Sequence, residues 1–134
     1  MEFVEMETKE DIMATAEIER TVAPEVMDHP EEYLSQIEHT VRMDSEAGAE
    51  YYLVYSGGAA GFFALHNEGL TVKVDKVAVL PAKRRKGVLK RILAFIRQTY
   101  DPTLLLINAH GKTCPPLEAL GFTLQGDCYE MRYE

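Results

Sequence analysis

The sequence predicts a single α/β domain of 134 residues, built on one mixed β-sheet. Three β-prone segments between Tyr51 and Leu80, separated by turns that contain glycine, predict an antiparallel meander. An amphipathic helix follows, with apolar residues at the spacing of one buried face: Val88, Leu89, Ile92, Leu93 and Ile96. The apolar run 104–107 comes next. It predicts a strand parallel to the end of the meander, because a helix connects the two.

The N-terminal part predicts an edge strand and a capped helix. Phe3 and Val4 lie in a short β-prone opening. Thr8, with an acidic residue three positions later, approximates a capping box and predicts a helix from about Lys9 to Val22. Its inward residues should be Ile12, Met13 and Ala16.

Pro24 is expected to end this first helix, and residues 23–29 to form a loop. A second helix should begin near Pro30, which is tolerated in a first turn. Its apolar face and its end are marked by Leu34, Ile37, Val41 and Gly48.

The remaining elements follow from alternation and turn chemistry. The meander should comprise three strands, at Tyr51–Tyr55, Ala59–His66 and Leu70–Leu80. After the central helix, a strand is expected over 103–108. Then come a brief helix capped by Thr113 and ended by Gly121, and a last hairpin around residues 126–127.

The charge of the chain is concentrated in one place. The net charge is −8, from 14 basic and 22 acidic residues, yet six cations lie within residues 83–91. A nucleic-acid binder normally spreads its cations along a face, so this single basic island disfavours a nucleic-acid partner. The four histidines and two cysteines lack metal-ligand spacing, and no metal is predicted.

Nothing in the sequence predicts a membrane protein. No apolar run approaches the roughly 20 residues that a membrane span needs. The first residues have neither a basic nor an apolar signal-peptide region. We therefore expect no membrane association and a cytoplasmic location.

The basic island lies between a strand and a helix. Residues 77–80 are apolar, Pro81 ends the strand, and Gly87 comes directly before the amphipathic helix. A helix start has unpaired backbone N–H groups and a partial positive charge, and glycine lets a ligand approach the backbone closely. This arrangement predicts a binding site for a polyphosphate. A solvated charged loop is the alternative.

Two short patterns mark this segment: Val77-x-Val79-x-Pro81, then Arg84-x-x-Gly87-x-Leu89. They resemble the acetyl-coenzyme A signature of the GNAT superfamily of N-acetyltransferases, although Leu89 stands where the family has Gly or Ala. The helix opening 8–12 and the segment Leu120-Gly121-Phe122 are also similar to that family. The resemblance covers nearly the whole chain and implies the element order β-α-α-β-β-β-α-β-α-β-β over residues 1–134.

The resemblance implies an acetyl-CoA-dependent N-acetyltransferase in which an amine attacks the thioester directly. Backbone N–H groups of the loop would hold the pyrophosphate, and strand backbone would pair with the pantetheine arm. Asn108 stands where family members often have an Asn that touches pantetheine; it is otherwise a polar residue at a strand end. The implied cofactor residues are Val77, Val79, Arg84, Arg85, Lys86, Gly87, Val88, Leu89, Lys90 and Asn108.

The catalytic groups are less clear from the sequence. Asp75 is the best carboxylate candidate for a general base; a water chain, or no dedicated base, is the alternative. The position where the family commonly has a thiolate-protonating Tyr is Leu117, which cannot donate a proton. His110 is the leading substitute, with Thr113 and Cys114 nearby, unless the thiolate leaves with water's help.

The acidic remainder of the chain predicts a cationic acceptor, such as a small-molecule amine or a basic peptide. By resemblance the first two helices border the acceptor pocket, where acidic residues gather: Glu25, Asp28, Glu31 and Glu32. Alternatively, those acidic residues only stabilise a helix start through its dipole. Leu89 and Leu117 favour an alternative function, a noncatalytic CoA-binding or protein-interaction module. A homodimer is compatible with either function.

Overall fold

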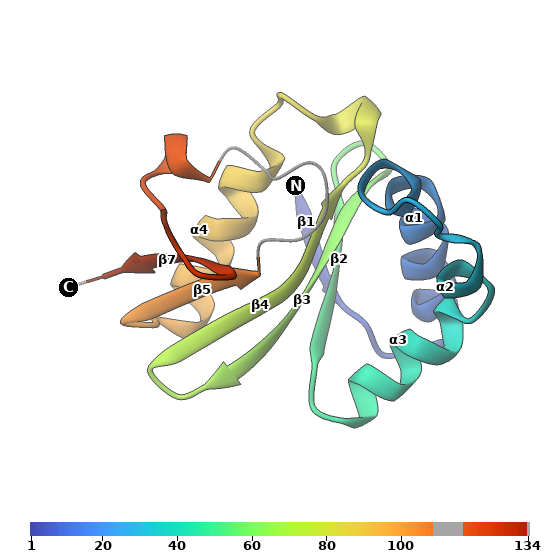
Figure 1. Cartoon of the computed structure of the whole chain (residues 1–134), viewed down its shortest axis with the longest axis horizontal. Coiled ribbons are helices and arrows are strands. Elements are labelled where there is room, and N and C mark those ends of the chain that lie inside the picture. The colour runs from blue at the N-terminus through green and yellow to red at the C-terminus, as the bar shows by residue number, and fades with distance from the viewer. Residues whose placement is uncertain (109–116, 134) are drawn as a thin grey trace.

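The computed structural model describes residues 1–108 and 117–133. Within these residues, seven strands form one mixed sheet in the order β1-β2-β3-β4-β5-β7-β6 (Figure 1). The strands are β1 (Glu2–Glu5), β2 (Glu50–Tyr55), β3 (Ala59–Glu68), β4 (Thr71–Val79), β5 (Leu104–Asn108), β6 (Thr123–Gln125) and β7 (Cys128–Arg132). β4 and β5 are parallel, as predicted, and the other neighbouring strands are antiparallel.

The helices cover both faces of the sheet (Figure 1). They are α1 (Lys9–Val26), α2 (Glu31–Ser35), α3 (Ile37–Glu46) and α4 (Val88–Tyr100), with 3₁₀ turns η1 (Pro81–Lys83) and η2 (Glu118–Leu120). Successive side chains of β2 point to opposite faces of the sheet. Tyr51 and Leu53 pack with α1 and α3, whereas Tyr52 and Val54 pack with α4. The sheet therefore separates two apolar cores.

The predicted capping box begins α1. The Thr8 hydroxyl accepts the Asp11 N–H at 3.1 Å, and the Asp11 carboxylate accepts the Thr8 N–H at 3.0 Å. Hydrogen bonds from the backbone N–H groups of Glu7 and Thr8 lower the pKa of Asp11. Met13, predicted to face inward, is 50% exposed, and Ile18 is buried instead.

The prediction that Pro24 ends α1 was wrong, since the helix continues through it to Val26. Proline removes one backbone donor, but in a last turn that loss affects a single bond. Met27 still donates its N–H to the Ala23 carbonyl at 2.9 Å. The loop that follows is consequently shorter than the expected 23–29.

The predicted second helix is divided into α2 and α3 at Gln36, whose φ of −118° and ψ of 14° leave helical geometry. Ile37 and Val41, predicted as its apolar face, are both buried. Both α2 and α3 lie on the same side of the sheet as α1 (Figure 1), where Tyr33 and Ile37 pack in one core.

β4 contains a bulge that positions the site. The register with β3 shifts between Ala64 and Leu65, so that Asp75 is the extra residue. On either side of this bulge, Val74 and Val77 both pack toward the core under α4, while Lys76 contacts groups on α1, α2 and α3. The bulge therefore reverses which side chains of β4 face each layer.

The C-terminal elements close the α4 side. The expected helix before Gly121 is described as the single turn η2, and Gly121 ends it at a φ of 97°. The predicted cap Thr113 lies outside the described residues. No helix in the described part of the chain is long and apolar enough to span a membrane. Nor does that part bring together three His, Cys, Asp or Glu side chains that could hold a metal ion.

Candidate active site

Among the described residues, the last part of β4 has no partner strand along one edge. The pairing of β4 with β5 ends at Val74 and Ile107, whereas the strand itself continues to Val79. The Leu80 N–H donates to the Ala60 carbonyl on β3 at 2.8 Å. Because hydrogen-bonding direction alternates along a strand, the backbone groups of Val77 and Val79 point away from β3. These two residues were the ones predicted to pair with pantetheine.

The loop after β4 presents backbone N–H groups to solvent. Arg85 and Gly87 have left-handed backbone conformations, with φ values of 61° and 80°. Where left-handed and right-handed residues alternate, successive backbone N–H groups point toward one side. Arg91 bonds back to the Gly87 carbonyl, so the N–H groups of residues 88–90 precede the first bond of α4. Apart from its two chain neighbours, a Cβ on Gly87 would meet no atom of the described residues within 4 Å. The backbone N–H groups of residues 85–90 thus form an open site at a helix start, which suits a phosphate group. We call this site the Gly87 cradle.

The six cations of residues 83–91 divide into two groups. Lys83 donates to the carbonyls of the β2–β3 turn, and Arg84 forms an ion pair with Glu25. The other four are exposed and form no ion pair within the described residues: Arg85, Lys86, Lys90 and Arg91. These four supply the positive charge around the cradle. Val88 is buried and Leu89 half-buried, so their backbone is the part available to a ligand.

Asp75 has a partner that the sequence did not reveal. Its carboxylate lies 2.5 Å from Nδ1 of His66, and the two side chains are 28% and 39% exposed. The pair stands where β4 leaves β5. Lys76, the next residue along β4, turns instead toward α1–α3. His66 belongs to no motif, and it meets Asp75 only through the bulged register of β3 and β4.

Beside this pair, a polar cluster ties the first three helices to β4. The Lys76 ammonium donates to the Tyr33 hydroxyl at 2.9 Å, and that hydroxyl donates to buried Glu19 at 2.8 Å. Tyr51 donates to Asp44 at 3.0 Å. Burial, with the nearby carboxylates, raises the pKa of both tyrosines. The cluster sets one ammonium, that of Lys76, between two carboxylates, those of Glu19 and Asp44, and holds Tyr33 against the sheet.

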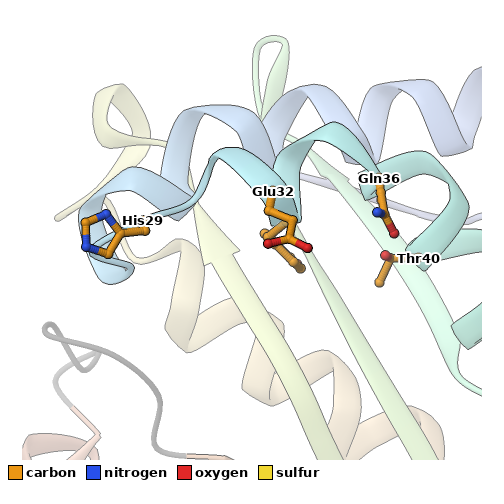
Figure 2. A pocket seen from close by; sticks show the side chains of 5 residues that line it. His29, Glu32, Gln36 and Thr40 are labelled. Carbon is orange, nitrogen blue, oxygen red and sulfur yellow. The ribbon is translucent and has the colours of Figure 1, made fainter.

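Tyr33 also lines a groove of about 360 Å³ beside α2 and α3. Figure 2 shows Glu32, Gln36 and Thr40 pointing to the same side of these helices, with His29 at the end of the groove. Every lining residue is polar. Of the acidic border predicted from the sequence, Glu32 lines this groove, while Glu25 is engaged with Arg84.

The other predicted site residues lie near β5. Asn108 ends β5 opposite Cys128, whose thiol donates to its amide oxygen at 3.4 Å. Leu117 is 1% exposed and packs in the core under α4, so this position faces no solvent. His110 and its neighbours Thr113 and Cys114 lie outside the described residues.

Because Leu117 is enclosed, Leu117→Tyr should lower the stability of the protein rather than create a proton donor. Overpacking a filled core typically costs about 1–3 kcal/mol. Thermal unfolding followed by circular dichroism measures the effect. Leu124→Tyr is the matched control, since Leu124 is 47% exposed and should tolerate the ring. Equal Tm values for the two variants would contradict the described packing.

The fold is similar to solved acetyltransferases. An aminoglycoside 6′-acetyltransferase type Ii has a TM-score of 0.72 at 12% identity, over 98% of this chain and 97% of that chain. The PaiA N-acetyltransferase from Thermoplasma acidophilum, in complex with coenzyme A, has a TM-score of 0.67 at 16% identity, over 99% and 100%. A GNAT family acetyltransferase from Brucella melitensis, in complex with acetyl-CoA, has 0.65 at 13% identity, over 99% and 89%.

No protein-family model and no curated protein sequence matches the chain. The likeness therefore lies in structure, and it extends over both chains almost completely. It includes the mixed seven-stranded sheet of the described residues, with helices on both faces. The chain has the fold of the GNAT acyl-CoA N-acyltransferases, as the resemblance in its sequence predicted.

Proposed function

We propose that this protein is an N-acetyltransferase that transfers an acetyl group from acetyl-CoA to a primary amine. The observation that carries the proposal is the open edge of β4, which leads directly into the Gly87 cradle. In an acetyl donor with an extended amide arm and a pyrophosphate, the arm would pair with the strand edge and the pyrophosphate would bind at the cradle. Two proteins of the same fold contain coenzyme A or acetyl-CoA, which supports the choice of donor.

The chain would bind the donor mainly through backbone. Val77 offers its N–H and C=O groups, and Val79 its N–H, along the open edge, as an added strand requires. The Val79 carbonyl already accepts a hydrogen bond from Nε of Arg84. The loop N–H groups and the α4 dipole favour the pyrophosphate, and exposed Lys86 and Lys90 add charge beside it. Asn108, across the opening at the end of β5, offers an amide.

The amine must lose a proton before it can attack. We assign this step to His66: its Nδ1 faces the Asp75 carboxylate, which orients the ring and leaves Nε2 to accept the proton. Acetyl-CoA supplies the activated carbonyl. A backbone N–H of the open β4 edge can donate to the carbonyl oxygen as negative charge develops there. The amine nitrogen forms the new C–N bond as the C–S bond breaks, and the thiolate leaves. The second proton that the nitrogen loses as it becomes an amide passes to the thiolate or to water.

The acceptor would enter along the polar groove beside α2. Glu32 lines this groove, and outside the basic island the chain carries 8 basic and 22 acidic residues. This field attracts ammonium groups and repels acids. A small polar amine or a basic peptide is therefore the acceptor class that we propose.

Calorimetric titration with coenzyme A and an acetylation assay over amines, basic peptides and acidic controls test the function together. We expect binding, turnover with cationic acceptors, and a kcat/KM that falls as salt screens the attraction. Preference for an acidic acceptor would overturn the acceptor class. Binding without turnover over the whole panel would favour the noncatalytic CoA-binding alternative. Absence of binding would overturn both of these functions and leave the protein-interaction module.

A further inference from the structure

The guanidinium of Arg84 joins three parts of the fold. Its Nη1 and Nη2 donate to the two carboxylate oxygens of Glu25 at 2.7 and 2.6 Å, and its Nε donates to the Val79 carbonyl at 2.9 Å. Glu25 lies in the last turn of α1, 59 residues away along the chain. Figure 1 shows the loop after β4 arching beside that end of α1. All three nitrogens of the guanidinium are thus engaged within the protein.

The preceding residue is anchored as well. The Lys83 ammonium donates to the carbonyls of Ser56 and Gly57 in the β2–β3 turn, at 2.7 and 3.2 Å. Two consecutive side chains therefore fasten the loop to different parts of the sheet and to α1. Directly after them comes Arg85, a non-glycine residue at a φ of 61°.

A left-handed conformation is unfavourable for arginine, and it persists only where the surrounding structure imposes it. The two residues directly before Arg85, Lys83 and Arg84, are the ones whose side chains are anchored to other parts of the fold. The same conformation turns the loop N–H groups toward the cradle.

We propose that Glu25 is a positioning residue for the cofactor loop: by clamping Arg84, it holds Arg85 in the left-handed conformation that the cradle needs. This inference rests on the proposed function, because it assigns the cradle to coenzyme A. In this role Glu25 acts through Arg84 and not by direct contact with coenzyme A. Its effect is transmitted by the two hydrogen bonds between its carboxylate and the guanidinium of Arg84. The same pair lowers the pKa of Glu25 and raises the pKa of Arg84.

The sign of the effect separates this role from simple electrostatics. Removing a carboxylate near an anion site should strengthen anion binding, because a repulsive charge is lost. Releasing Arg84 to contact phosphate directly would act in the same direction. A positioning role predicts the opposite result, weaker binding after the carboxylate is removed.

The test is the affinity for coenzyme A of Glu25→Gln, measured by calorimetry. We expect Kd to rise about threefold to tenfold. In turnover, KM for acetyl-CoA should rise while kcat and KM for the amine stay unchanged. Glu17→Gln is the matched control, because Glu17 is also on α1 and pairs with an arginine, Arg20, at 3.1 Å. Its Kd should be equal to that of wild type or slightly lower.

A double-mutant cycle with Arg85→Gly tests the mechanism itself. Glycine adopts a positive φ without strain, so a loop with Gly at 85 should no longer need the clamp. We compare the Kd with Gln at position 25 to the Kd with Glu there, as a ratio. In the Arg85→Gly background this ratio should fall toward one, although loss of the Arg85 cation weakens binding by both proteins of that background. Equal ratios in the two backgrounds would overturn the proposal.

Two further outcomes have definite meanings. Tighter binding or unchanged binding by Glu25→Gln, in a variant whose circular dichroism and Tm match those of wild type, would exclude the positioning role while leaving the proposed function intact. A wild-type protein that binds no coenzyme A would instead overturn the proposed function, and this inference with it.

Discussion

Gly87→Val should bind coenzyme A about tenfold more weakly than wild type, or worse, which corresponds to at least about 1.4 kcal/mol of binding free energy. Gly87 has a φ of 80°, and the space where a Cβ would stand is open. A valine there would put its methyl groups into the space proposed for the pyrophosphate. It would also strain the loop, because β-branched residues strongly disfavour positive φ. Calorimetry gives the affinity.

The strain and the steric effect can be separated with a second glycine. Gly69, in the β3–β4 turn, has a φ of 79° and equally open surroundings. Gly69→Val should therefore lose stability to a similar degree while it keeps the wild-type affinity for coenzyme A. If both variants bind coenzyme A equally well, the ligand does not occupy the Gly87 cradle.

Much of the fold could be predicted because its signals are local. The capping box at Thr8, the glycine turns of the meander and Pro81 at the end of β4 each specify a boundary within a few residues. The backbone part of the cofactor site is local for the same reason. Its strand end, its glycine and its helix start are consecutive in the sequence, so Gly87 could be identified without knowledge of tertiary contacts.

The side-chain part of the site depends on contacts between distant residues. The bulge at Asp75 changes the register of β3 and β4, and only that register brings His66 to the carboxylate. Glu25 meets Arg84 because α1 continues through Pro24, contrary to the sequence-based expectation. A proline near a helix end is ambiguous until packing decides it, and a bulge leaves no residue signature here. Neither partner could therefore be recognised from local patterns.

His66→Gln should reduce kcat/KM for a cationic amine about 10²-fold at neutral pH, the lower range for removal of a general base. Asp75→Asn should have an effect in the same direction, since it removes the carboxylate that orients the ring. The loss should shrink as pH rises, because an increasing share of the amine then enters already deprotonated. The measurement is a pH profile of kcat/KM for wild type and both variants.

His39→Gln is the control for the loss of one histidine, because His39 is exposed on α3 and far along the chain from the pair. It should keep the wild-type profile, and all variants should keep the wild-type Kd for coenzyme A, since neither His66 nor Asp75 belongs to the cradle. If His66→Gln lowered kcat/KM by the same factor at every pH, proton removal would not be its role. Wild-type activity in His66→Gln together with loss in Asp75→Asn would make Asp75 itself the base.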